Sequence, residues 1–192
     1  KQEAMVGGGF GQLTENGQHK ENGLYRFAPE GVELFERLIS RLPSDLEGYD
    51  RQEQLARLMA DFNHDQRRLF RTVVDGFLLH MRRLEASDIE IGGANASSSI
   101  WLRIQGRKMA RPEMGKWSLQ QSAVLIHSLL TAKQSERLLK NRAVDFSYAM
   151  EKEGATLRWR ACAYFDLGFL ALNMRTISHK VFPYQKLNIP DP

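Results

Sequence analysis

The sequence is poor in cysteine, with only Cys162 among its 192 residues. A single cysteine excludes a disulfide within the chain and any zinc site built from several thiolates. Its neighbours are apolar, so we expect a buried, unreactive thiol. No apolar run approaches the ~18 residues of a membrane span, and no secretory leader pattern opens the sequence. These absences predict a soluble, intracellular chain.

Motifs of the common catalytic sites are also missing. Glycine precedes lysine only at Gly115-Lys116, and Trp117 follows where a phosphate-binding loop needs serine or threonine. The glycine-rich run at 7–11 has no lysine and hydroxyl pair after it. No G-x-S-x-G or S-x-x-K segment offers a serine nucleophile, and the carboxylates are scattered. We expect no catalytic residue here, and no nucleotide hydrolysis by this chain on its own.

Histidine is scarce and its positions form no metal-binding pattern. For His80 and His127, both on expected helices, we predict surface or helix-packing roles and no metal site. The five histidines are His19, His64, His80, His127 and His179.

Charge is the next constraint. The formal net charge of +4 is mildly basic and suits a partner that carries phosphate, but it is small for a dedicated nucleic-acid-binding protein. We therefore do not expect nucleic acid as the partner. The chain starts at Lys1 and ends in a turn-like sequence at Pro192, so we expect both ends to be cuts in a longer protein.

Composition and periodicity divide the chain into four segments. Residues 1–28 are rich in glycine, asparagine and glutamine and predict a flexible N-terminal tail. A helical segment is predicted over 29–84, and a domain of mixed helices and strands over 85–178. The last segment, 179–192, has little pattern and predicts a linker.

The helical segment begins at Pro29, which suits a first helical turn. Its first helix is expected to end at Leu42, because a residue that precedes proline disfavours the α conformation. Two more helices are predicted, one after a turn at 44–50 and one from near Asp65. The apolar stripe of the first helix consists of Val32, Phe35, Leu38, Ile39 and Leu42.

From Ile89 the apolar period changes from that of a helix to that of a strand. Gln105-Gly106 predicts a tight hairpin turn, and Ser118 with Gln121 predicts a helix N-cap. The fold class expected is α+β, a PAS-like antiparallel sheet with helices on one face. The elements predicted are strands at 89–91, 100–104 and 108–111, helices from 118 and over 133–140, and strands at 143–150, 156–164 and 169–177.

Two clusters of basic residues are candidate binding sites. The first surrounds the predicted hairpin at Gln105-Gly106, with two tryptophans nearby. Arginine beside tryptophan is typical of a surface on which nucleic-acid bases stack, whereas charge on a sheet edge also prevents aggregation. This cluster consists of Arg103, Arg107, Lys108, Arg111 and Lys116, with Trp101 and Trp117.

The second cluster consists of Arg158, Arg160 and Arg175 on the last two predicted strands. Arg158 and Arg160 are two residues apart, so they share one face of a strand. Guanidinium groups gathered in this way can bind a phosphate. The alternative is that they form salt bridges with Asp145 or Glu151.

Four segments in order resemble the N-terminal, PAS-like domain of the type II/type IV secretion ATPase superfamily, which includes PilT-like pilus-retraction motors and conjugation or effector-secretion ATPases. The match extends over about residues 70–177 and leaves 29–63 unexplained. The sequence departs from the family at Cys162, where asparagine is usual, and in the short acidic loop at 166–168. The four segments are ASDIEI (86–91), LRIQGRK (102–108), LLTAKQSERLLKNRAVDFSYAM (129–150) and LRWRACAYFDLGFLALNMRTI (157–177).

The resemblance implies a non-catalytic, oligomer-forming and regulatory domain that moves against a RecA-like ATPase domain missing from this chain, toward which the linker at 179–192 would lead. It implies that Arg158, Arg160 and Arg175 contact nucleotide, with ATP and magnesium bound by the full-length protein. Expected partners are the motor domain, neighbouring subunits of a homo-hexamer, and secretion or pilus components at the inner membrane, with the protein itself cytoplasmic. The alternative is a stand-alone PAS-like sensory or partner-binding module.

Overall fold

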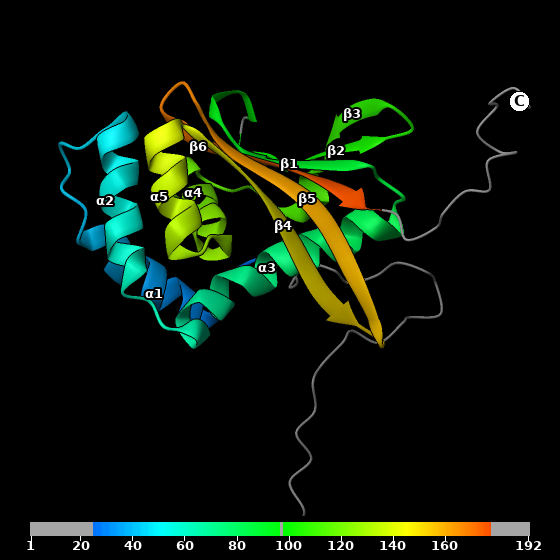
Figure 1. The fold of residues 1–192 in the computed structure, drawn as a ribbon, viewed down its shortest axis with the longest axis horizontal. Coiled ribbons are helices and arrows are strands. Elements are labelled where there is room, and N and C mark those ends of the chain that lie inside the picture. The colour runs from blue at the N-terminus through cyan, green and yellow to red at the C-terminus, as the bar shows by residue number, and fades with distance from the viewer. Residues whose placement is uncertain (1–24, 97, 178–192) are drawn as a thin grey trace, which may run out of the picture.

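The computed structural model describes residues 25–96 and 98–177 (Figure 1). The linker expected at 179–192 and most of the predicted tail, 1–24, lie outside these residues. None of the helices in the described part combines the length and apolar character that crossing a bilayer requires.

Five α helices form where the sequence shows a helical period. The N-cap residue immediately before each helix has an extended backbone conformation. Three of them start with a capping box, in which the side chains of Asn63, Ser118 and Thr131 accept from a backbone N–H three residues on. The helices are α1 (Pro29–Ser40), α2 (Gly48–Ala60), α3 (His64–Arg83), α4 (Leu119–Leu129) and α5 (Ala132–Asn141).

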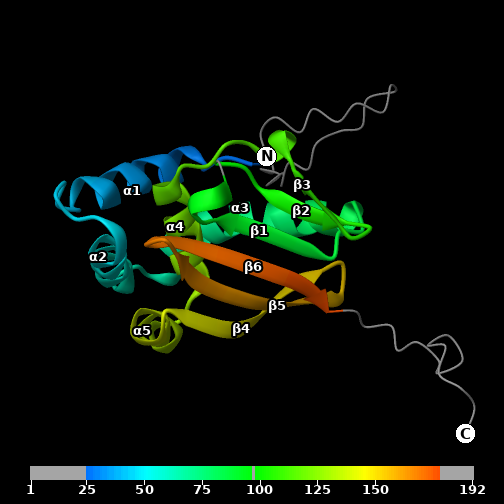
Figure 2. The same ribbon diagram turned by 90° about the horizontal axis from the view of Figure 1, so that it is seen from above.

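Six strands form one sheet in which every neighbouring pair is antiparallel, in the order β3-β2-β1-β6-β5-β4 (Figure 2). One hairpin turn lies at the predicted Gln105-Gly106, and in all three hairpin turns a glycine, Gly106, Gly154 or Gly168, adopts the left-handed conformation that favours this residue. The strands are β1 (Asp88–Gly92), β2 (Trp101–Ile104), β3 (Arg107–Ala110), β4 (Ala143–Lys152), β5 (Ala155–Asp166) and β6 (Phe169–Ile177).

Helices α3 and α4 pack on one face of the sheet, and α1, α2 and α5 gather at one end of the strands (Figures 1 and 2). Alternate strand residues such as Ile89, Leu102, Trp159 and Met174 point into this helical layer and are fully buried. The α+β prediction, an antiparallel sheet with helices on one face, is confirmed. The opposite face carries no α helix among the described residues, and we call it the open face.

The helical segment and the sheet share one hydrophobic core, which also includes two residues of the predicted tail. Tyr25 stacks on Phe77 with ring centroids 5.6 Å apart, and Phe27 packs edge-on against Phe70 and Trp117. The ordered core therefore begins at least at Tyr25, four residues before the first helix.

The predicted apolar stripe of the first helix is buried at Leu38 and Leu42 and partly buried at Phe35 and Ile39, but the prediction is wrong at Val32. Val32 is 41% exposed, whereas Gly31, Leu34 and Leu38 are buried. A Cβ built at Gly31 would lie 3.3 Å from the Cβ of Phe27, so glycine permits a close approach at this point. A count of apolar residues misses this contact because glycine has no apolar side chain, so Gly31 was left out of the predicted stripe.

Candidate functional site

The open face of the sheet carries a line of polar residues that crosses all six strands, and all of them except the one on β4 are charged. Cross-strand pairing places each of these residues directly opposite the next, so their side chains emerge side by side. We call this line the basic row; from β3 to β4 it consists of Lys108, Arg103, Asp88, Arg175, Arg160 and Ser147.

The three predicted arginines are brought together in and beside this row. Arg160 pairs directly with Arg175 on the neighbouring strand, and Arg158 follows on the same face of β5. Like charges directly opposite each other disfavour a strand pair, so this arrangement costs stability unless a counterion or ligand compensates. The strand face predicted to gather guanidinium groups is therefore present.

The alternative interpretation is that these arginines form salt bridges within the chain, and the three arginines differ in how strongly they do so. Arg160 Nη2 lies 3.6 Å from Asp145 Oδ2, with both side chains more than half exposed, so this pair contributes little. Glu151 accepts from the hydroxyl of Thr156. For Arg158 we find no ion pair within residues 25–96 and 98–177.

Arg175 is held most firmly, by a carboxylate that the sequence analysis assigned no role. Its Nε donates to Asp88 Oδ1 at 2.7 Å, and the Asp88 side chain is only 5% exposed. Ser87 Oγ donates to Asp88 Oδ2 at 2.7 Å, and Arg103 Nε lies 3.6 Å from the same oxygen. The alternation of Asp88 with Ile89 and Ile91 was the signal that could have placed this carboxylate on the open face.

These contacts set the charge state of the row. Burial by itself raises the pKa of Asp88, but hydrogen bonds from Arg175 and Ser87, with the charges of Arg175 and Arg103, outweigh it and lower the pKa overall. The hydrogen bond and charge of Asp88 in turn raise the pKa of Arg175. Asp88 is ionised at neutral pH, and the row as a whole remains cationic.

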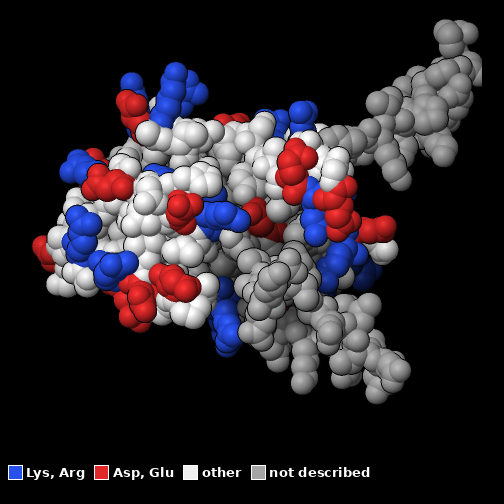
Figure 3. All heavy atoms as spheres, turned by 90° about the horizontal axis from the view of Figure 1, so that it is seen from below, with Lys and Arg blue, Asp and Glu red and all other residues white. Residues whose placement is uncertain are grey.

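The first basic cluster of the sequence analysis is divided by the fold. Trp117 is buried, donates from Nε1 to the carbonyl of Met114, and offers no stacking surface. Lys108 forms an ion pair with Glu90 and lies 5.4 Å from the centre of the Trp101 ring. The charged-edge interpretation therefore describes this region better. Figure 3 views the molecule from the side opposite to Figure 2, and on that side, away from this cluster, basic and acidic groups are interspersed.

Cys162 lies half-buried on the open face, between Asp145 and Asn173 on the neighbouring strands, which corrects the expectation of a buried thiol. Strand alternation places it on the same face as Arg160. Burial, followed by the hydrogen bond and charge of Asp145, raises the pKa of the thiol, so it is protonated and poorly nucleophilic.

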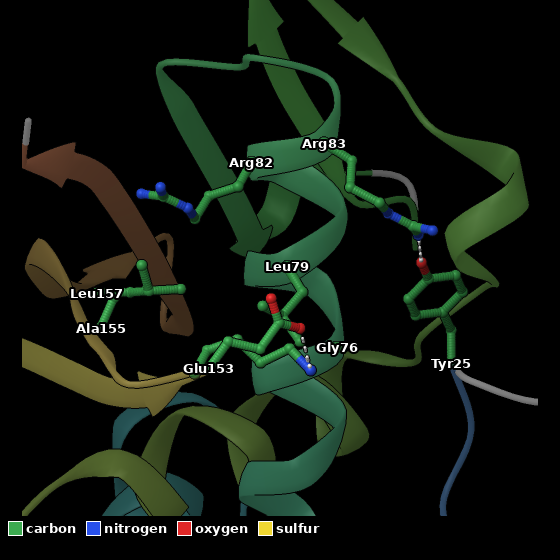
Figure 4. A pocket seen from close by; sticks show the side chains of 9 residues that line it. Tyr25, Gly76, Leu79, Arg82, Arg83, Glu153, Ala155 and Leu157 are labelled. Atoms are coloured by element: carbon green, nitrogen blue, oxygen red, sulfur yellow. Dashed lines mark hydrogen bonds and ion pairs between the residues drawn. The ribbon is translucent and has the colours of Figure 1, made fainter. Parts of the chain in front are cut away.

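Two hollows, of about 630 and 640 Å³, lie away from the basic row. One, of about 630 Å³, opens between α3, Tyr25 and the tip of the β4–β5 hairpin (Figure 4). Gly76 and Leu79 of α3 form one wall and Leu157 of β5 another, with Arg82 at the rim. It lies on the helix-covered side of the sheet. In the part of the chain that the structure describes, no group of three histidine, cysteine or acidic residues is placed to hold a metal ion.

Comparison with known proteins gives one informative similarity. The sequence matches no described protein family and no curated protein. Its structure is similar to that of the pilus retraction motor PilT, solved with bound ADP, at 25% sequence identity and a TM-score of 0.51. The match covers 60% of this chain and 32% of the PilT chain. The chain therefore corresponds to about a third of such a motor.

Two further structures are similar at lower TM-scores. The ATPase DotB of Legionella pneumophila matches with 25% identity and a TM-score of 0.45, over 62% of this chain and 32% of DotB. DotB of Yersinia pseudotuberculosis matches with 17% identity and a TM-score of 0.44, over 68% of this chain and 34% of that one. Because both scores are lower, we infer a relationship from PilT alone. The chain is related in structure to part of a pilus retraction motor.

Proposed function

We propose that this chain is the N-terminal oligomerisation and regulatory domain of a hexameric secretion, pilus or conjugation ATPase. It has no phosphate-binding loop, so its contribution is mechanical and electrostatic: it moves against the motor domain and presents arginines to the nucleotide bound there. The observation that carries this proposal is the open face, where Arg158, Arg160 and Arg175 emerge together on a fold similar to part of PilT.

The arginines suit the charge that develops on a nucleotide during phosphoryl transfer. A guanidinium group carries a permanent positive charge and several N–H donors in one plane, which match the oxygens of a phosphate. We assign the contact with the nucleotide to all three: Arg158 and Arg160 have the freest side chains, and Arg175 is already held by Asp88. ATP and Mg²⁺ would be held by the motor domain, where its own carboxylates and hydroxyls supply the metal ligands.

The proposed partners follow from the same role. They are the chain's own motor domain, neighbouring copies in a homo-hexamer, and secretion or pilus components at the inner membrane, with the protein on the cytoplasmic side. The short turn at Asp166-Leu167-Gly168 carries no arginine, so we assign it no part in nucleotide contact.

The gene that encodes this chain offers the first test. We expect a G-x-x-x-x-G-K-[ST] segment within a few tens of residues after Pro192, because the motor needs a loop whose backbone N–H groups surround the phosphates. A gene that encodes no such segment would refute the proposed role.

ATP turnover by the full-length protein offers the second test. Arg160→Ala should lower kcat by ~10³-fold, the lower end of the range of ~10³ to ~10⁵ for an arginine that stabilises the transferring phosphoryl group. Arg107→Ala is the matched control, since Arg107 is an exposed arginine of the same sheet that lies on the opposite face. Undiminished turnover in Arg160→Ala would remove the site assignment.

One observation favours the alternative of a stand-alone sensory or partner-binding module. The hollow beside Leu79 and Leu157 is large enough, at about 630 Å³, for a small apolar ligand. Saturable binding of such a ligand, combined with a gene that encodes no motor domain, would favour this function over the first.

A further inference from the structure

The basic row contains one carboxylate, Asp88, and it lies at the centre of the row. Cross-strand pairing sets it directly between Arg175 on β6 and Arg103 on β2. A buried carboxylate is costly unless its oxygens are satisfied, and here both are, through Arg175 and Ser87. The position of Asp88 is therefore fixed before any ligand arrives.

The hydrogen bond to Arg175 leaves most of that side chain available. Asp88 accepts from Nε, whereas the terminal NH₂ groups of a guanidinium carry four further donors. The Arg175 side chain is 68% exposed, so these donors face solvent on the open face. A bond at Nε thus orients the group without using the donors that an anion would bind.

We propose that Asp88 is a positioning residue for an anion site on the basic row, which orients Arg175 so that Arg175 and Arg160 bind the same polyphosphate chain. The inference rests on the proposed function, because it assigns the phosphates of a nucleotide to this row. Orienting a long side chain in advance removes part of the entropy cost of binding.

If Asp88 acted only through its charge, removing it would have the opposite effect on anion binding from the one that positioning predicts. A carboxylate lowers the positive potential around it, so removing it would strengthen the binding of an anion. Removing a residue that orients Arg175 would weaken binding instead. Glu90 provides the matched control, because it lies on the same strand and the same face but pairs with Lys108 and stands opposite Asn173.

The test is a calorimetric titration of the full 192-residue chain with inorganic tripolyphosphate at fixed ionic strength. We expect Asp88→Asn to weaken binding about tenfold, the effect typical of losing a group that orients a ligand-binding side chain. Glu90→Gln removes the same charge and should leave the affinity within about twofold or raise it. Equal or tighter binding by Asp88→Asn, equal weakening by Glu90→Gln, or no binding by the unaltered chain would each overturn the proposal.

Two further measurements keep the test decisive if Asp88→Asn folds poorly. Ser87→Ala removes a hydrogen bond to Asp88 without changing the charge, and it should weaken tripolyphosphate binding about twofold to threefold. In the Arg175→Ala background this Ser87→Ala effect should vanish, because Asp88 acts through Arg175. If Ser87→Ala weakened tripolyphosphate binding to the same extent in the Arg175→Ala background, Asp88 would not act by positioning Arg175. Neither result depends on ATP turnover by the longer protein, so the two proposals can fail separately.

Discussion

The two faces of the sheet are built from the same strands and differ completely in character. On β5, Trp159 and Ala161 point into the helical layer and are fully buried, whereas Arg158 and Arg160, their immediate neighbours, are exposed on the open face. The helical face contains the residues that hold the fold together. The open face contains exposed charges gathered in one row, which is why the candidate function is placed there.

Adjacent substitutions on β5 should separate the two faces most strongly. Trp159→Ala is expected to destabilise the chain by ~3–5 kcal/mol, because it leaves a large cavity in the core. Arg158→Ala should change the free energy of unfolding by less than ~0.5 kcal/mol, since its side chain lies at the surface. Urea denaturation of both variants measures the difference. A large loss of stability in Arg158→Ala would show that the open face also supports the fold.

Protonation offers a second way to separate the faces, because the helical layer encloses a neutral imidazole. His127 is buried in α4, and neither ring nitrogen has a hydrogen-bond partner among the described residues. Burial first, and then the charge of Arg67, lower its pKa from 6.5 to about 4. The unfolded chain therefore binds more protons between these pH values, and stability falls as the pH is lowered through this range.

The size of this effect makes it measurable. A shift from 6.5 to about 4 corresponds to a loss of about 3 kcal/mol by the lower end of the range. His127→Leu should remove that part of the pH dependence and fit the apolar site. Urea unfolding of both proteins at pH 7 and pH 4.5 is the comparison, and parallel losses of stability in the two would mean that His127 is not the group responsible.

The helical face was largely predictable from sequence, because apolar period alone locates helices and strands. Ser118 was identified as a cap from its spacing to Gln121, and the same spacing at Asn63 and Thr131 would have identified two more. The period could not reveal Gly31, since a contact made through a missing side chain leaves no apolar signal.

The open face was predictable only in part. Strand alternation placed Arg158 and Arg160 on one face, but which residues stand opposite them depends on strand order. Asp88 precedes Arg175 by 87 residues and meets it only because β1 pairs with β6. A sequence pattern of local range does not specify that pairing. The carboxylate that holds Arg175 was therefore missed, although the shared face of Arg158 and Arg160 was predicted.

The smallest expected effect concerns the β5–β6 turn, which belongs to neither face. Leu167 has φ of 50° and is 81% exposed, in a two-residue turn that ordinarily favours asparagine followed by glycine. Leu167→Asn should raise stability by ~0.5–1 kcal/mol, because asparagine tolerates the left-handed conformation. Leu167→Val should lower it by about 1 kcal/mol, since a β-branched side chain tolerates it least. Thermal unfolding measures both. If asparagine instead lowered stability, Leu167 would have to make contacts within the chain that offset its strain, and the turn would belong with the helical face.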